Sequence, residues 1–362
     1  MLRTPGPIEE QPRLVIEDCP LPEPGPGELR LRVEACGVCH TDLHVVEGEL
    51  PPLGRPVVPG HQIVGRVDAV GPGAVGDVLG RSLDAVGSRA VGDVLGRSLD
   101  AVGSDVEPAL LGRRVGVGWL GWTDGTCRHC RAGQENLCEQ ARFTGYQLFG
   151  GYAGAVVANT AFVYPLPDAT DPTRLAPLLC AGVVGYRALR LSGAGPDTRL
   201  GLYGFGASAH LVLQVARHLG CHVLVFTRGD QHRRLALELG AEWAGPADNT
   251  RPPGGPLHAA IIFAPAGSLV PLALAALDRG GTLVLAGIYM SPIPPLMYDL
   301  LWHERTVRSV ANATRQDARE LLGLAEKVPL QVGVERQPLA EANTALSRLK
   351  GGGVRAALVL TP

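Results

Sequence analysis

Residues 200–209 read LGLYGFGASA. The pattern Gly204-x-Gly206-x-x-Ala209 follows a short apolar run and opens a helical pattern, which is typical of a dinucleotide-binding strand–turn–helix unit. The first glycine permits the tight turn, the second lets the backbone approach a pyrophosphate, and the alanine lets the helix pack on the sheet. The alternative, a turn that serves packing alone, stays open. The turn residues that we expect to bind a cofactor are Gly204, Phe205, Gly206 and Ala207.

The sequence around this turn predicts an α/β fold with two domains. Apolar runs at 200–203 and 223–226 alternate with helical patterns at 210–219 and 233–239, which indicates βαβ units and a doubly wound parallel sheet. We place this cofactor domain at 176–305. Short β-branched runs before it, at 29–35, 63–70 and 113–117, predict a mainly β domain that spans 1–175 and, where the pattern becomes mixed again, 306–362.

The end of the second apolar run bears on the choice of cofactor. That run ends in Phe226, Thr227 and Arg228, and no acidic residue stands at its tip to bind a ribose 2′-hydroxyl. Arg228 could instead receive a 2′-phosphate, which slightly favours NADP over NAD. The alternative is a solvated arginine, with the adenosine held in another way.

Composition excludes several classes of protein. The chain has 362 residues, 46% of them hydrophobic and 19% charged, so it is not intrinsically disordered. Its 33 basic and 35 acidic residues give a net charge of -2, which does not favour binding to nucleic acid or to a membrane surface. Residues 1–10 lack the apolar run of a signal peptide, and we expect a cytoplasmic protein. The long uncharged stretch at 252–277 is interrupted by Pro265, Gly267 and Pro271, and we expect a buried strand and helix there.

Four possible metal ligands are grouped in one short segment. Cys127-x2-Cys130-x7-Cys138 places three thiols in a compact loop, and Asp124 could supply a fourth ligand. Zinc at a structural site takes four tetrahedral ligands and accepts a carboxylate oxygen. We therefore expect a structural zinc, against the alternative of three reduced, unligated cysteines.

Another segment contains an exact duplication. AVGDVLGRSLDAVGS occurs at 74–88 and again at 90–104. Two units are too few for a repeat fold, which needs at least three to bury a core. We expect a tolerated surface insertion at 74–104, because added loop length costs little stability; a contact with a partner is the alternative.

Five ordered motifs resemble the zinc-dependent alcohol dehydrogenases, the zinc branch of the medium-chain dehydrogenase/reductase (MDR) family. They are CGVCHTDLH (36–44), PGHQIVGRV (59–67), GTCRHCRAGQENLC (125–138), LLCAG (178–182) and GFGASAH (204–210). The resemblance runs nearly from end to end, with the duplicated segment as the main exception. It implies a GroES-like fold for the mainly β domain and a Rossmann fold for 176–305.

The resemblance also assigns roles that spacing does not reveal. It implies that Cys39, His61 and Cys180 hold a catalytic zinc, although each on its own could be an ordinary buried residue. Together with the segment 119–142 around the structural site, this makes two zinc ions per chain. Thr41 matches the hydroxyl that bonds the alcohol, and His44 matches the outer member of a proton relay.

The remaining correspondences concern groups that support the site. Asp42 matches the carboxylate that holds the ligand histidine, and Arg355 resembles a residue near the cofactor phosphates. Two positions depart from the family: Gln62 stands where a glutamate is usual, and Asp124 replaces the first cysteine of the structural site.

The activity implied is hydride transfer between a primary or small secondary alcohol, or its aldehyde, and NAD(P), by a homodimer or homotetramer. Zinc would lower the pKa of the alcohol hydroxyl. One alternative is a non-catalytic NADPH-binding scaffold or redox sensor, because Gln62, Asp124 and the insertion depart from the pattern. A zinc-free quinone reductase of the same superfamily is disfavoured, because all three catalytic ligands are present.

Overall fold

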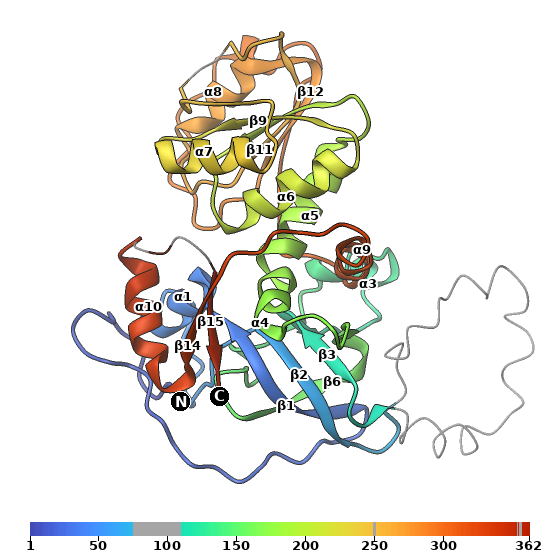
Figure 1. The fold of residues 1–362 in the computed structure, drawn as a ribbon, viewed down its shortest axis with the longest axis vertical. Coiled ribbons are helices and arrows are strands. Elements are labelled where there is room, and N and C mark those ends of the chain that lie inside the picture. Colours follow the sequence, from blue (N-terminus) through green and yellow to red (C-terminus); the bar gives the residue numbers. More distant parts are fainter. Residues whose placement is uncertain (75–109, 249–250, 353, 355–356) are drawn as a thin grey trace, which may run out of the picture. The chain divides into compact units, whose positions relative to one another are not determined.

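The computed structural model describes residues 1–74, 110–248, 251–352, 354 and 357–362. It contains two compact units, Met1–Cys180 with Gly333–Pro362, and Ala181–Val332 (Figure 1). The duplicated insert expected at 74–104 lies outside the described residues except for Ala74.

The first unit is built on a seven-stranded sheet. The strand order is β14-β15-β1-β2-β3-β7, and β6 also pairs with β1. Every pairing is antiparallel except β14 with β15. Alternate residues of β1 are buried, so one face of this strand packs in the core. The strands are β1 (Glu28–Gly37), β2 (Gln62–Val70), β3 (Arg114–Val117), β6 (Ala155–Asn159), β7 (Val163–Pro165), β14 (Val334–Pro338) and β15 (Ala357–Thr361).

Short helices and one hairpin complete this unit. Helix α1 begins after Cys39, whose side chain caps it, and ends at Gly48 in the left-handed conformation, φ 80°. The hairpin of β4 and β5 flanks the loop that carries the four clustered ligands. The other elements are α1 (His40–Glu47), β4 (Leu120–Trp122), α3 (Arg128–Arg131), η4 (Glu135–Leu137), β5 (Arg142–Phe143), η5 (Thr160–Phe162), α4 (Pro172–Leu175), η6 (Ala176–Leu179), η8 (Leu339–Glu341) and α10 (Ala342–Lys350).

The second unit is a parallel six-stranded sheet in the order β10-β9-β8-β11-β12-β13. Its direction of growth reverses between β8 and β11, which is the switch point where cofactors bind in such sheets. In its core, Tyr203 stacks on Phe226 with ring centroids 4.2 Å apart. The strands are β8 (Arg199–Tyr203), β9 (His222–Phe226), β10 (Trp243–Gly245), β11 (Leu257–Ile262), β12 (Leu277–Leu285) and β13 (Thr306–Ser309). The helices are α5 (Ala181–Ser192), α6 (Ala207–His218), α7 (Asp230–Glu238), α8 (Leu269–Ala276), η7 (Tyr298–Leu300) and α9 (Arg315–Ala325).

The predicted fold class, a mainly β unit and a parallel α/β unit, is confirmed. The observed unit boundaries differ from those expected, because 306–332 belongs with the parallel sheet. Two contacts keep it there: β13 pairs in register with β12, and Asp317 of α9 accepts a 2.8 Å hydrogen bond from Arg187 of α5.

Within the described residues, no single helix is long and apolar enough to cross a membrane, although the bent pair Pro172–Leu179 and Ala181–Ser192 passes that test jointly by length and composition.

Candidate metal and cofactor sites

Three distant residues of the first unit bring their donor atoms together. Sγ of Cys39 lies 3.9 Å from Sγ of Cys180, and Nε2 of His61 lies 3.3 Å from the latter sulfur. All three donor atoms lie within 4.8 Å of one another. Tetrahedral zinc with Zn–S bonds of about 2.3 Å sets two sulfurs about 3.8 Å apart. Two sulfurs and one imidazole in this arrangement therefore fit a zinc ion with one position left open.

Each of these ligands lies at a helix end or next to a glycine with a positive φ. Cys39 stands between β1 and α1, where its sulfur accepts the Thr41 N–H at 3.5 Å. His61 is fully buried and follows Gly60, whose φ of 97° suits glycine. Cys180 ends the 3-10 helix η6. Backbone structure thus fixes the direction of each ligand.

Asp42 holds the imidazole. Its Oδ1 accepts hydrogen bonds from Nδ1 of His61 at 2.9 Å and from the Gly60 N–H at 3.1 Å, and its Oδ2 accepts the Cys39 N–H at 2.9 Å. Once Nε2 has lost its proton, a histidine that donates from Nδ1 offers Nε2 as an electron-pair donor to a metal. Burial lowers the pKa of His61, but Asp42 and Cys39 outweigh burial and raise the pKa to about 10.

The two thiols have opposite character. Contact with the Cys180 thiol, together with His61, holds the pKa of Cys39 well below its ordinary value. Contact with Cys39 and burial hold the pKa of Cys180 well above its ordinary value. One of the pair therefore readily carries a negative charge, and a divalent cation would favour the charge on both.

Thr41 and His44 are three residues apart on α1 and so share one side of it. The Thr41 hydroxyl lies 3.7 Å from Sγ of Cys39, next to the ligand set. Nδ1 of His44 lies 2.6 Å from Oε2 of Glu49, a residue that the sequence analysis missed. Gly48 ends the helix and turns the chain back toward its last turn. A glutamate directly after such a glycine was the sequence signal that could have identified Glu49 as a partner of His44.

Two neighbours complete the surroundings of His61. Gln62 is buried, and its amide lies over Gly37 of β1, where a Cβ would come 2.4 Å from the amide oxygen. Trp119 meets the His61 ring edge to face, with centroids 5.0 Å apart, and stacks on Phe143 at 5.0 Å. The aromatic stack fixes one wall beside the ligand histidine.

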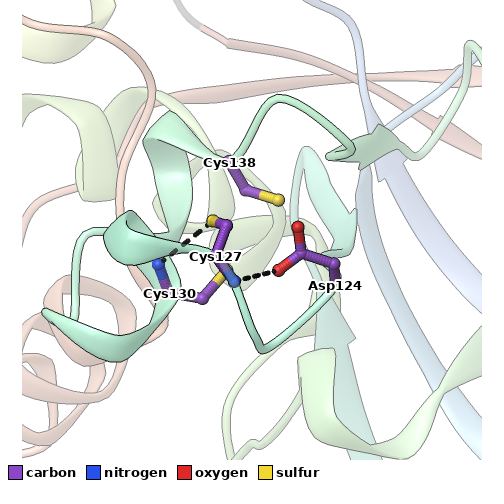
Figure 2. Close-up of side chains that lie close together, drawn as sticks. All are labelled: Asp124, Cys127, Cys130 and Cys138. Atoms are coloured by element: carbon purple, nitrogen blue, oxygen red, sulfur yellow. Dashed lines mark hydrogen bonds between the residues drawn. The ribbon is translucent and has the colours of Figure 1, made fainter.

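The second ligand set lies in the loop between β4 and β5 (Figure 2). The donor atoms of Asp124, Cys127, Cys130 and Cys138 lie within 4.8 Å of one another. Oδ1 of Asp124 accepts the Thr126 N–H at 2.8 Å and the Cys127 N–H at 2.9 Å, and these bonds lower the pKa of the carboxyl. The Cys130 N–H lowers the pKa of Cys127, whereas burial raises that of Cys130 to about 12. Three sulfurs and one oxygen fit a closed tetrahedral zinc site.

The glycine turn has the expected form in the second unit. Gly204 has a φ of 85°, and a Cβ there would lie 2.9 Å from the backbone of Ala264. Gly206 is the extended N-cap of α6, and space is open where its Cβ would stand. Phe205 is buried, and Ala207 is the first residue of the helix. The turn thus leaves backbone N–H groups free to face an anion.

The tip of β9 carries the residues expected to select the cofactor. Thr227 is buried and Arg228 is exposed. Arg233 of α7, which the sequence analysis missed, donates to the Thr227 and Arg228 carbonyls, both at 3.1 Å. Arg355 lies outside the described residues.

Comparisons with known proteins show the family of the chain. The model of the alcohol dehydrogenase GroES-like domain matches residues 25–92 and 85–168, and that of the zinc-binding dehydrogenases matches 209–327. The chain is 45% identical to "Probable alcohol dehydrogenase AdhA" of Mycobacterium tuberculosis, over 99% of this chain and 95% of that protein. It is 34% identical to an alcohol dehydrogenase of Geobacillus stearothermophilus, over 96% and 95%.

The fold of the chain is also similar to that of a solved reductase structure. The acetophenone reductase of Geotrichum candidum, in complex with NAD, matches with a TM-score of 0.76 and 25% identity, over 97% of this chain and 94% of that one.

Proposed function

This chain belongs to the zinc-type MDR alcohol dehydrogenases and is an NAD(P)-dependent oxidoreductase, and we propose that it interconverts primary or small secondary alcohols and their carbonyl products at a zinc held by Cys39, His61 and Cys180. The convergence of these three donor atoms carries the proposal. None of the comparisons supports a scaffold without catalysis.

The ligand residues prepare the chain for a metal before one binds. Zinc with an open position acts as a Lewis acid and lowers the pKa of a hydroxyl bound to it. The Cys39 and Cys180 thiolates would balance the charge of a divalent ion. Asp42 fixes the proton of His61 on Nδ1, and Trp119 keeps the imidazole from turning.

Proton transfer would run along α1. The Thr41 hydroxyl, 3.7 Å from Sγ of Cys39, is placed to accept the proton of an alcohol hydroxyl. Nδ1 of His44 contacts Oε2 of Glu49 at 2.6 Å, so a proton that His44 receives can pass to this carboxylate. The Glu49 side chain is 45% exposed, so a proton that reaches it can pass to water. We add Glu49 to the relay for this reason.

The second site would hold a structural zinc, which makes two zinc ions per chain. Asp124 would supply the oxygen ligand through Oδ2, because Oδ1 is bonded to two backbone N–H groups. Four protein ligands would then close this metal site, and it would take no part in the chemistry.

For the cofactor we propose the Gly204–Ala207 turn of the second unit and a preference for NADP, which rests on the exposed Arg228 beside Thr227. Arg233 does not serve as a free phosphate ligand, because backbone carbonyls hold it. Arg228→Ala should raise KM for NADPH more than for NADH, whereas the exposed neighbour Arg234→Ala should change neither. Equal effects of Arg228→Ala on both cofactors would remove the preference.

We also propose a homo-oligomer. Strand β13 pairs only with β12 among the described strands, and large apolar side chains nearby in sequence are more than half exposed: Met297, Tyr298 and Trp302. A second copy would bury such surface. Light scattering should give a dimer or tetramer, and a monomer at micromolar concentration would contradict this.

Metal analysis combined with turnover tests the main proposal. We expect about two zinc ions per wild-type chain, one in Cys39→Ala, and no measurable alcohol oxidation by that variant. Cys221→Ala, which changes a buried thiol of the other unit, should keep both metal and turnover. A folded, fully zinc-loaded protein without turnover on a panel of alcohols and aldehydes, with either cofactor, would refute the proposed reaction.

A further inference from the structure

The Tyr152 hydroxyl is a buried polar group close to the first ligand set. The residue is 8% exposed, and its hydroxyl has no hydrogen-bond partner of good geometry among the described residues. Buried hydroxyls in native proteins are nearly always bonded, either to protein or to an ordered water. A buried hydroxyl of this kind therefore calls for an explanation.

The ring of Tyr152 lies against the residue that precedes the ligand histidine. Its N–H donates to the Pro59 carbonyl at 2.9 Å, and the Gly151 N–H donates to Gly60 at 2.8 Å. A Cβ on Gly60 would come 2.4 Å from Cδ1 of the tyrosine, so the ring covers the place where a side chain would stand. Position 60 thus needs a glycine for two reasons: its positive φ and the close packing of the Tyr152 ring.

The ring position places the hydroxyl near Asp42, because the ring packs on Gly60 and the Gly60 N–H bonds Oδ1 of Asp42. Burial raises the pKa of Tyr152 well above its ordinary value, and the negative charge of Asp42 raises it further. The thiols of Cys36 and Cys39 act in the same direction. The direction of this pKa shift agrees with a hydroxyl near the carboxylate that orients His61.

The Asp42 carboxylate has room for one more donor. Two carboxylate oxygens offer about four acceptor positions. Three are taken within the described residues, by the His61 ring and by the N–H groups of Gly60 and Cys39. The position left over is on Oδ2, and the Tyr152 ring packs on Gly60, whose N–H is one of the three donors to this carboxylate.

We propose that Tyr152 is a positioning residue for the metal ligand His61, whose hydroxyl donates to Asp42 directly or through one buried water and keeps the carboxylate aligned with Nδ1. The inference rests on the proposed zinc site. It concerns the retention of the metal, and turnover is not needed to test it.

Tyr152→Phe removes only the hydroxyl. We expect zinc at the Cys39, His61 and Cys180 site to pass to a chromophoric chelator about tenfold faster than from wild type, the lower end of the effects seen when groups that support metal ligands are changed. Zinc release from the two sites should give two kinetic phases, and the phase of this site is identified as the one that Cys180→Ser lacks. The phase of the other site should be unchanged.

Tyr203→Phe is the matched control, because it also removes a buried hydroxyl with no partner in the described part of the chain, but in the other unit. It should leave both phases unchanged. In an Asp42→Asn background, Tyr152→Phe should add no further loss, because its effect passes through that carboxylate. If Tyr152→Phe does not fold, Tyr152→Met tests the loss of the hydroxyl together with the ring, and zinc release at the wild-type rate would still overturn the role.

The outcomes separate the two claims. Wild-type zinc retention in folded Tyr152→Phe, or a full tenfold effect that persists without the Asp42 carboxylate, would overturn the role of Tyr152. A wild-type protein that holds no zinc at this site would refute the proposed metal site and this inference with it.

Discussion

Asp42→Asn is the substitution that tests the first ligand set most directly. Within the described residues, this carboxylate accepts hydrogen bonds from three donors: the His61 ring and the N–H groups of Gly60 and Cys39. An amide of the same shape has only one acceptor atom, so it cannot satisfy donors on both sides. Either orientation leaves one side facing an NH₂ group.

Both orientations have a cost that follows from the geometry. If the amide oxygen faces His61, the Cys39 N–H loses its partner, and a buried unsatisfied donor costs about 1–3 kcal/mol of stability. If the oxygen faces Cys39, the His61 proton is favoured on Nε2, the atom that would bind metal. Zinc affinity should therefore fall about 10- to 100-fold, which corresponds to about 1.4–2.7 kcal/mol.

Two measurements on the apoprotein check these values. Competition with a chelator of known zinc affinity gives the loss of affinity, and denaturant unfolding without metal gives the loss of stability. Asp168→Asn is the control, because that side chain is 63% exposed and pairs with Arg66 at the surface. If Asp42→Asn bound zinc as tightly as wild type and unfolded at the same denaturant concentration, the assignment of this carboxylate would be wrong.

Three further predictions concern other parts of the molecule. Asp317→Ala should cost about 3–5 kcal/mol in denaturant unfolding, because it leaves mostly buried Arg187 without its carboxylate, whereas Arg190→Ala, at a side chain 45% exposed, should cost no more than about 1 kcal/mol. Burial raises the pKa of Asp317, but Thr314 and Arg187 outweigh burial and lower the pKa below its ordinary value of 3.8. The stabilisation by the carboxylate is complete above pH 3.8 and is lost as the pH falls through the lowered pKa. The free energies of unfolding of wild type and Asp317→Asn should therefore converge in acid. Gly60→Ala should cost at least about 1–3 kcal/mol and weaken zinc binding, because its φ is positive and its Cβ would strike Tyr152; Gly54→Ala, with φ 67° and open space, shows the cost of φ alone. Asp124→Ala should release the zinc of the Cys127, Cys130 and Cys138 site to a chelator faster than wild type, and Asp124→Cys should release it more slowly. Release rates equal to that of wild type in both variants would mean that the carboxylate is not a ligand.

The parallel α/β unit could be predicted in detail because its signals are local. The glycine turn at 204–209 and the alternation that follows it depend only on neighbours in sequence, and the structure has β8, α6, β9 and α7 at those places. The end of this unit could not be placed, because β13 is only four residues long and three of its residues, Thr306, Arg308 and Ser309, are exposed. The pairing of β13 with β12 assigns this strand to the parallel α/β unit, and such a pairing leaves no periodic pattern in the sequence.

The two ligand sets differ in the same way. Asp124, Cys127, Cys130 and Cys138 lie within fifteen residues, and their spacing alone suggests a site. Cys39 and Cys180 are 141 residues apart, and only the family resemblance connects them in the sequence. Glu49 and Tyr152 were missed for a related reason: each acts on a functional residue through the fold, and neither belongs to a motif.

The start of helix α1 explains why the first ligand set is so dependent on its surroundings. Cys39 is both a metal-ligand candidate and the N-cap, and Asp42 both completes the capping box and orients His61. The N-terminus of a helix favours negative charge, so the same backbone that needs capping also favours the Cys39 thiolate. Helix formation and ligand geometry therefore share their hydrogen bonds. A substitution at either residue should alter apoprotein stability and zinc affinity together, whereas a change at Tyr152, which caps nothing, should affect the metal alone.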